Sequence, residues 1–128
     1  MAPELELDVL PGVYAVARLD PADAVPEWAR DPTFCATVAT AHELTVVCPA
    51  DAVPADVRHE GPFRGLAVRG PLDFALTGIL AALAQPLADA GISIFALSTF
   101  DTDVLLVRAA DLAGAATALE AAGHRVRT

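Results

Sequence analysis

Residues 63–128 decide the fold, and they read FRGLAVRGPLDFALTGILAALAQPLADAGISIFALSTFDTDVLLVRAADLAGAATALEAAGHRVRT. Short runs of apolar and β-branched residues alternate here with two stretches rich in alanine and leucine. The first such stretch carries an apolar stripe at helical spacing, formed by Leu76, Ile79, Leu80, Leu83 and Leu87. The pattern predicts strand, helix, strand, strand, helix and strand over residues 64–69, 74–90, 92–99, 103–108, 111–122 and 124–127.

The ends of the predicted helices carry recognisable signals. Asp73 suits the N-cap position of the first helix, because its carboxylate can accept a hydrogen bond from a first-turn amide. Pro86 is expected to bend the last turn of this helix. Gly91 and Gly123 suit the left-handed position that follows a helix. The order β-α-β-β-α-β is the ferredoxin-like arrangement, so we expect an α+β fold with an antiparallel sheet.

Residues 1–62 look like an abbreviated copy of the same unit. Eight of the ten prolines precede residue 63, so any helix in this half must be short. The stretches 12–16 and 65–68 align, and Phe34 and Asp51 align with Phe95 and Asp111. We predict strands at 13–19, 34–40 and 44–48, one or two helical turns at 25–30, and loop and turn over 49–61. The sequence therefore predicts two ferredoxin-like halves, at 1–62 and 63–128.

The two cysteines fall in a predicted hairpin. If Ala41-His42 is a two-residue turn, the numbers of paired residues sum to 83, so Cys35 faces Cys48. Alternation from the turn makes them a non-hydrogen-bonded pair, with Cα atoms about 4.5 Å apart. That spacing allows a disulfide. In a reducing cytosol the two residues would instead be small buried hydrophobes.

The composition excludes several classes of function. The formal net charge is −9, and residues 1–62 carry eleven acidic residues against three arginines, which disfavours nucleic-acid binding. The absence of lysine excludes Schiff-base chemistry and a P-loop, and neither Ser93 nor Ser98 lies in a nucleophile elbow. No apolar run approaches the roughly 20 residues of a membrane span, and the acidic start is unlike a signal peptide. We therefore expect a cytoplasmic protein.

Two segments carry a resemblance to a known family. GPLDFALTGI at 70–79, followed by GISIFALSTFDTD at 91–103, resembles the small bacterial tandem ACT-domain proteins. These are similar in turn to the ACT modules of aspartate kinases and of eukaryotic cytosolic arginine sensors. The resemblance runs from Leu7 to Val126 and implies a degenerate ACT-like half at 1–62 and an ACT domain at 63–128. It also implies amino-acid binding at the loop after the first strand and along the second strand, often across an interface, and a homodimer.

This resemblance, together with the chemistry of the residues, predicts a ligand site. The first amides of the helix can hold a ligand carboxylate, Asp73 can accept from an α-ammonium, and Thr77 can add a hydroxyl. A zwitterion suits such a site better than an anion. Asp101 and Asp103 are candidate further contacts, although a turn is commonly polar because it is solvated. The predicted ligand-binding residues are Gly70, Pro71, Leu72, Asp73, Phe74, Thr77, Gly78, Ile94, Ser98 and Thr99.

The sequence leaves three classes of function open. The favoured one is a non-catalytic regulatory module that senses a small-molecule amino acid, with no cofactor. The alternative is a module with a vestigial ligand site that binds an unidentified protein partner. An enzyme is disfavoured because no catalytic triad, spaced carboxylate pair or metal cluster is apparent. His42 and His59 fall in predicted loops, and His124 follows a helix end, where a partial positive charge is favourable.

Overall fold

The computed structural model describes residues 4–73 and 77–128. The chain forms two compact units. The larger unit combines Met1–Pro11 with Arg64–Thr128, and the smaller unit is Gly12–Phe63.

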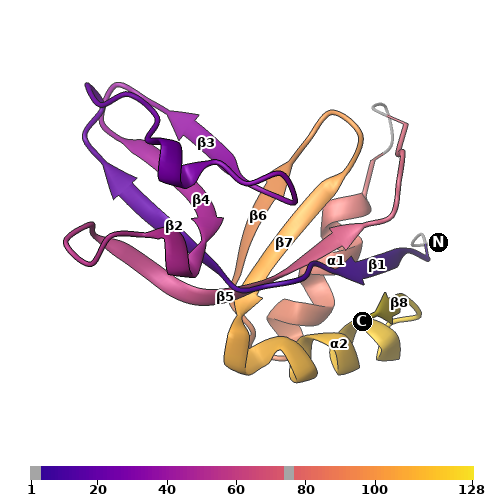
Figure 1. Cartoon of the computed structure of the whole chain (residues 1–128). Helices are drawn as coiled ribbons and strands as arrows, with labels where there is room; N and C mark the ends of the chain where they lie inside the picture. The colour runs from indigo at the N-terminus through magenta and orange to yellow at the C-terminus, as the bar shows by residue number, and fades with distance from the viewer. Residues whose placement is uncertain (1–3, 74–76) are drawn as a thin grey trace. The chain divides into compact units, whose positions relative to one another are not determined.

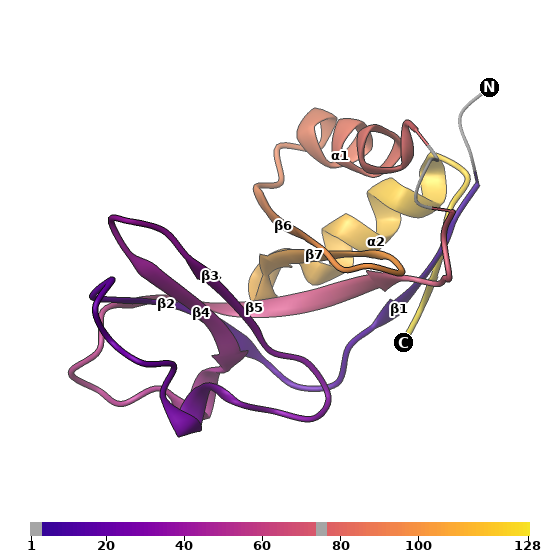
Figure 2. The ribbon, with the colours of Figure 1, turned by 90° about the horizontal axis from the view of Figure 1, so that it is seen from above.

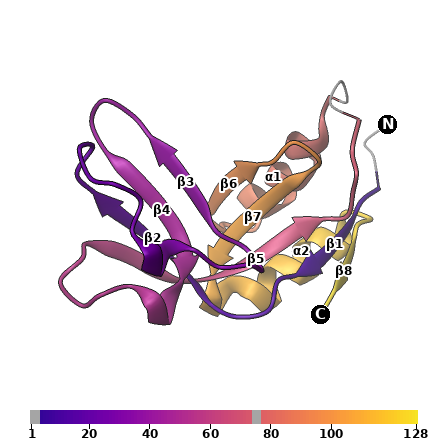
Figure 3. The same cartoon turned by 45° about the horizontal axis from the view of Figure 1, so that its top comes forward.

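The larger unit has the predicted α+β, ferredoxin-like arrangement. The described part of its sheet has the strand order β6-β7-β5-β1-β8 (Figures 1 and 3). Its elements are β1 (Glu6–Val9), the second half of β5 (His59–Val68), α1 (Ile79–Asp89), β6 (Ile94–Ser98), β7 (Asp103–Arg108), the 3₁₀ turn η3 (Ala109–Asp111), α2 (Leu112–Ala121) and β8 (Arg125–Arg127). Gly91 and Gly123 have the positive φ angles that the sequence predicted.

Both helices of the larger unit cover the same face of its sheet (Figure 2). The apolar stripe of α1 and the alternating residues of the strands close a core formed by Leu5, Leu7, Leu66, Val68, Ile79, Leu83, Leu87, Leu105, Val107, Ala115 and Leu119. Within the described ranges, no helix is long and apolar enough to cross a membrane.

Strand β1 was not predicted from the sequence. A ferredoxin-like sheet would place β8 beside β5, but β1 lies between them, antiparallel to β5 and parallel to β8. Leu7 is fully buried and pairs with Val68 on one side and Val126 on the other. On the opposite face, Arg69 contacts Asp8 at 2.8 Å and Glu6 at 3.2 Å. The strand alternates apolar and acidic residues, so core packing on one face of the sheet and ion pairs with Arg69 on the other both stabilise it.

The smaller unit repeats the same chain order without α-helices in the described structure. Two 3₁₀ turns occupy the places of the helices, which confirms an abbreviated first half. The elements are β2 (Tyr14–Leu19), η1 (Glu27–Ala29), β3 (Ala36–Ala39), β4 (Leu44–Pro49), η2 (Ala50–Ala52) and the first half of β5. Their strand order, β3-β4-β2-β5, matches β6-β7-β5-β8 of the larger unit once β1 is left aside.

The predicted hairpin register is confirmed. Val38 pairs with Thr45, and the Thr40 N–H donates to the Glu43 carbonyl at 2.9 Å. Ala36, the first residue of β3, pairs with Val47, so the same register continued by one residue would set Cys35 opposite Cys48.

The predicted start of the first helix is wrong. The helix α1 begins at Ile79, and its N-cap is Gly78 in the left-handed conformation (φ 79°), with no side-chain cap. Asp73 is therefore not the N-cap. Residues 74–76, including the predicted site residue Phe74, lie outside the described residues. A left-handed residue interrupts the right-handed helical path, so the described helix starts only after Gly78.

His124 is buried, contrary to the expectation of a favourable charge at a helix end. Its Nδ1 accepts from the Leu5 N–H at 3.1 Å, and its Nε2 lies 3.1 Å from the Ala82 carbonyl oxygen. Ala82 would ordinarily bond to the amide four residues later, but that residue is Pro86, which has no N–H. The imidazole, donating from Nε2, replaces the missing helix hydrogen bond.

Candidate ligand site

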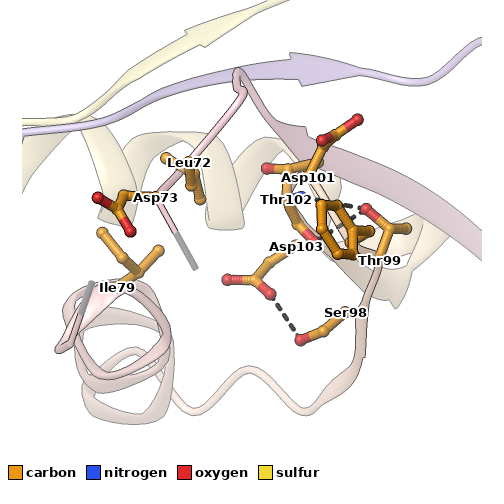
Figure 4. Close-up of a pocket in the computed structure, with 9 residues that line it drawn as sticks. Leu72, Asp73, Ile79, Ser98, Thr99, Asp101, Thr102 and Asp103 are labelled. Atoms are coloured by element: carbon orange, nitrogen blue, oxygen red, sulfur yellow. Dashed lines mark hydrogen bonds between the residues drawn. The ribbon is translucent and has the colours of Figure 1, made fainter. Parts of the chain in front are cut away.

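A pocket of about 200 Å³ lies in the larger unit, between the 70–73 loop, the start of α1 and the β6–β7 turn (Figure 4). It is smaller than the roughly 300–1,000 Å³ of pockets that hold drug-sized ligands, so it suits a small metabolite. Its lining consists of Leu72, Asp73, Ile79, Ser98, Thr99, Phe100, Asp101, Thr102 and Asp103.

The β6–β7 turn is fixed by hydrogen bonds through its two threonines. The Thr99 N–H donates to the Thr102 carbonyl at 2.7 Å, and the Thr102 N–H donates to Thr99 Oγ1 at 3.1 Å. Thr102 Oγ1 donates to the Val68 carbonyl at 2.6 Å, which ties the turn to the end of β5. The Leu72 N–H donates to the Asp101 carbonyl at 2.8 Å and brings the 70–73 loop against the turn. Two walls of the pocket are therefore held together by backbone and threonine contacts.

Asp103 is the carboxylate best placed to meet a ligand. Figure 4 shows it pointing into the space between Leu72, Ile79 and Ser98, whereas the carboxylates of Asp73 and Asp101 point outward. Ser98 Oγ donates to Asp103 Oδ1 at 2.6 Å, which fixes that side chain and leaves its other oxygen for a ligand donor. Three carboxylates and no basic side chain line the pocket within the described residues.

The start of α1 lies at the same pocket. The Ala82 N–H donates to the Gly78 carbonyl at 2.9 Å, so the amides of residues 79–81 precede the first bond of this helix. Ile79, whose side chain lines the pocket, carries the first of them. The positive end of the helix dipole therefore lies beside a wall that is otherwise acidic.

The structure brings only part of the predicted site together. Four predicted residues line the pocket: Leu72, Asp73, Ser98 and Thr99. Thr77 and Gly78 are exposed and precede α1, and Ile94 packs against the core instead. Gly70 and Pro71 shape the loop without lining the cavity.

The pocket is also lined by Ile79, Phe100 and Thr102, which were not predicted from the sequence as site residues. Ile79 was predicted to belong to the apolar stripe of the helix, and it does pack in the core as well as line the pocket. The polar sequence STFDTD at 98–103 is the feature that could have identified Thr102 as a pocket residue.

Gly70 is expected to resist substitution because the turn approaches it closely. A Cβ at this position would lie 3.1 Å from the Asp101 carbonyl oxygen, 3.2 Å from the Leu72 nitrogen and 3.3 Å from Thr102 Cβ. Gly70→Ala should therefore push the turn away from the loop, lower the free energy of unfolding by about 1–2 kcal/mol and widen the pocket. Urea denaturation measures the first effect.

Gly114 provides the matched control. It lies within α2, and an added Cβ would meet only Ile92 Cδ1 at an ordinary 3.6 Å. Gly114→Ala should raise the free energy of unfolding by about 0.5–1 kcal/mol, since alanine favours a helix interior. Equal effects of the two substitutions would refute the close approach at Gly70.

Comparisons with known proteins agree with this architecture. A family model described as an ACT domain matches residues 58–121, and a model of an N-terminal domain matches residues 12–56. A crystal structure of a protein from Agobacterium tumefaciens is 42% identical, covers 98% of this chain and 93% of its own, and superposes with a TM-score of 0.92. No protein of curated function matches.

More distant structures share the fold. A Vibrio cholerae protein described as a possible transport protein is 22% identical over 94% of this chain and 91% of its own, with a TM-score of 0.77. The regulatory subunit of aspartate kinase from Thermus flavus is 12% identical over 94% of this chain and 97% of its own, with a TM-score of 0.62.

Proposed function

This chain belongs to the ACT-domain family, and on that basis we propose that it is a non-catalytic regulatory protein that binds a free amino acid in the pocket beside α1. One observation carries the proposal: a small pocket has an inward-pointing carboxylate on one wall and the start of a helix on another. The fold shared with a regulatory subunit of aspartate kinase also favours a regulatory role.

The charges of the pocket match the two ends of a zwitterion. In our proposal the free oxygen of Asp103 accepts from the α-ammonium of the ligand, and the hydroxyls of Ser98 and Thr99 assist. The α-carboxylate faces the amides of residues 79–81, where the helix dipole favours negative charge. The remaining acidic residues, Asp73 and Asp101, disfavour a second negative charge on the ligand.

Neutral and basic amino acids should therefore stabilise the protein, and aspartate and glutamate should do so least. A ligand that binds only the native state adds about 2.7 kcal/mol at a hundredfold excess over Kd. For a chain of 128 residues this corresponds to a rise of roughly 5–10 °C in Tm. A thermal-shift screen against the twenty amino acids measures it.

The variant Asp103→Asn tests the site itself. Losing a charge-assisted hydrogen bond costs about 1.5–3 kcal/mol, so the Kd of the effective amino acid should rise roughly 10- to 100-fold. Asp89→Asn is the control, because Asp89 is exposed at the end of α1 and does not line the pocket. If no amino acid shifts Tm, or if Asp103→Asn binds as tightly as Asp89→Asn, the proposal fails in favour of a module that binds another protein.

The proposal includes a cytoplasmic homodimer, the assembly that the sequence resemblance implied. Sedimentation of the full chain with and without the effective amino acid addresses this part separately from binding.

A further inference from the structure

In the smaller unit Cys35 immediately precedes β3, and Cys48 lies in the neighbouring strand β4. The pairs Ala36–Val47 and Thr37–Val46 fix the register of β3 and β4, and this register continued by one residue beyond the start of β3 sets Cys35 opposite Cys48. Counting from the bond between Thr40 and Glu43, this is a non-hydrogen-bonded pair, in which Cα atoms approach to about 4.5 Å. Partners in such a pair direct their side chains to the same face of the sheet. This expected spacing lies within the range of about 4.4–6.8 Å that a disulfide needs.

The two thiols differ in environment. Cys35 is exposed, whereas Cys48 is fully buried and packs in the core cluster with Ala17 and Val46. Burial raises the pKa of the Cys48 thiol, and the negative charges of Cys35, Asp31 and Asp51 raise it further. An oxidant in solution therefore meets Cys35 first, while Cys48 stays protonated and shielded.

We propose that Cys35 and Cys48 form a reversible peroxide-responsive disulfide between β3 and β4. In the first step the Cys35 thiolate attacks one oxygen of hydrogen peroxide, the O–O bond breaks, and Cys35 sulfenic acid and hydroxide form. In the second step Cys48 loses its proton and attacks the Cys35 sulfur. The S–O bond breaks, and the departing hydroxide takes up the proton as water. Two thiols and one peroxide yield one disulfide and two waters.

Closure would covalently fix β3 to its neighbour. β3 pairs only with β4 in the described structure and forms one edge of the smaller unit's sheet, whereas β4 is also paired to β2. The bond joins the strands near the end remote from the Ala41-His42 turn, so the hairpin becomes closed at both ends. The disulfide would restrict the unfolded chain, but only across a short loop. Tm should therefore rise by about 5–10 °C on oxidation.

The test treats the reduced 128-residue chain with a modest excess of hydrogen peroxide. The number of thiols titrated in denaturant should fall from two to zero per chain, the intact mass should fall by two hydrogen atoms, and the product should run as a single chain without reductant. Dithiothreitol should restore both thiols. The rate of the second step should rise with pH, because the thiolate fraction of Cys48 increases as the pH approaches its raised pKa.

Two variants separate the steps. Cys48→Ala should accumulate a sulfenic acid at Cys35 that dimedone traps, whereas Cys35→Ser should keep a Cys48 thiol that reacts slowly with peroxide. The proposal is overturned if wild-type protein over-oxidises at Cys35 while Cys48 still titrates in denaturant. It is equally overturned if the only disulfide formed joins two chains through Cys35. These measurements on wild-type protein need neither variant to fold.

Discussion

Replacing Leu83 by alanine is expected to lower the free energy of unfolding by about 3–5 kcal/mol. Leu83 lies at the centre of α1, has no exposed surface, and packs in the core shared by both helices and three strands of the larger unit. The substitution removes three buried carbon atoms and leaves a cavity that the sheet and helices cannot fully close. The shift of the urea midpoint at constant m-value measures the effect.

The control for this substitution lies on the same helix. Leu80 is 41% exposed, so Leu80→Ala makes the same chemical change with little loss of buried surface and should cost less than about 1 kcal/mol. Because α1 also forms one wall of the pocket, Leu83→Ala should weaken ligand binding as well, through the position of Ile79. Similar losses for the two variants would contradict the assigned core.

The second large effect is expected at His124. His124→Ala should lower the free energy of unfolding by about 3–4 kcal/mol. It leaves the buried Leu5 N–H and the Ala82 carbonyl without their hydrogen-bond partner and removes the packed ring. His42→Ala is the control: His42 is exposed in the hairpin turn, and its loss should change the free energy of unfolding by less than about 0.5 kcal/mol. Chemical denaturation of both variants provides the comparison.

A double-mutant cycle identifies the origin of the His124 effect. Alanine at position 86 has an N–H that can bond to the Ala82 carbonyl, so His124→Ala should cost about 1 kcal/mol less in the Pro86→Ala background. Strict additivity of the two substitutions would mean that the ring contributes through packing and the Leu5 contact alone.

The sequence predicted the fold well where the signal was periodic. The strand at 103–108, the order of elements and the register of the hairpin all followed from apolar alternation and turn length. The strand β1 escaped because a four-residue alternation is too short to distinguish from a loop, and its stability comes from partners far along the chain. The predicted start of α1 was misplaced because Asp73 has a side chain suited to an N-cap, whereas the helix begins only after the left-handed Gly78.

The site was predictable as a region but not as a set of contacts. The segments 70–73 and 98–99 were both identified, and Leu72, Asp73, Ser98 and Thr99 from them line one pocket. Which carboxylate points inward was not predictable, because it depends on the Ser98–Asp103 hydrogen bond across the hairpin. The burial of His124 was equally unpredictable from the sequence. Only the three-dimensional fold brings it to the Ala82 carbonyl, which Pro86 leaves without its usual helix hydrogen bond.

The insertion of β1 between β5 and β8 has a consequence for how the chain is made. β1 is synthesised well before its parallel partner β8 at 125–127, because the smaller unit and most of the larger unit lie between them in the sequence. At about 5–20 residues per second, Leu5 and Leu7 wait on the order of ten seconds for their final partners. The contiguous smaller unit can acquire its pairing during that interval. The larger unit cannot complete its sheet until β8 has been made, so β1, with Leu7 not yet buried, is a segment that a chaperone would meet.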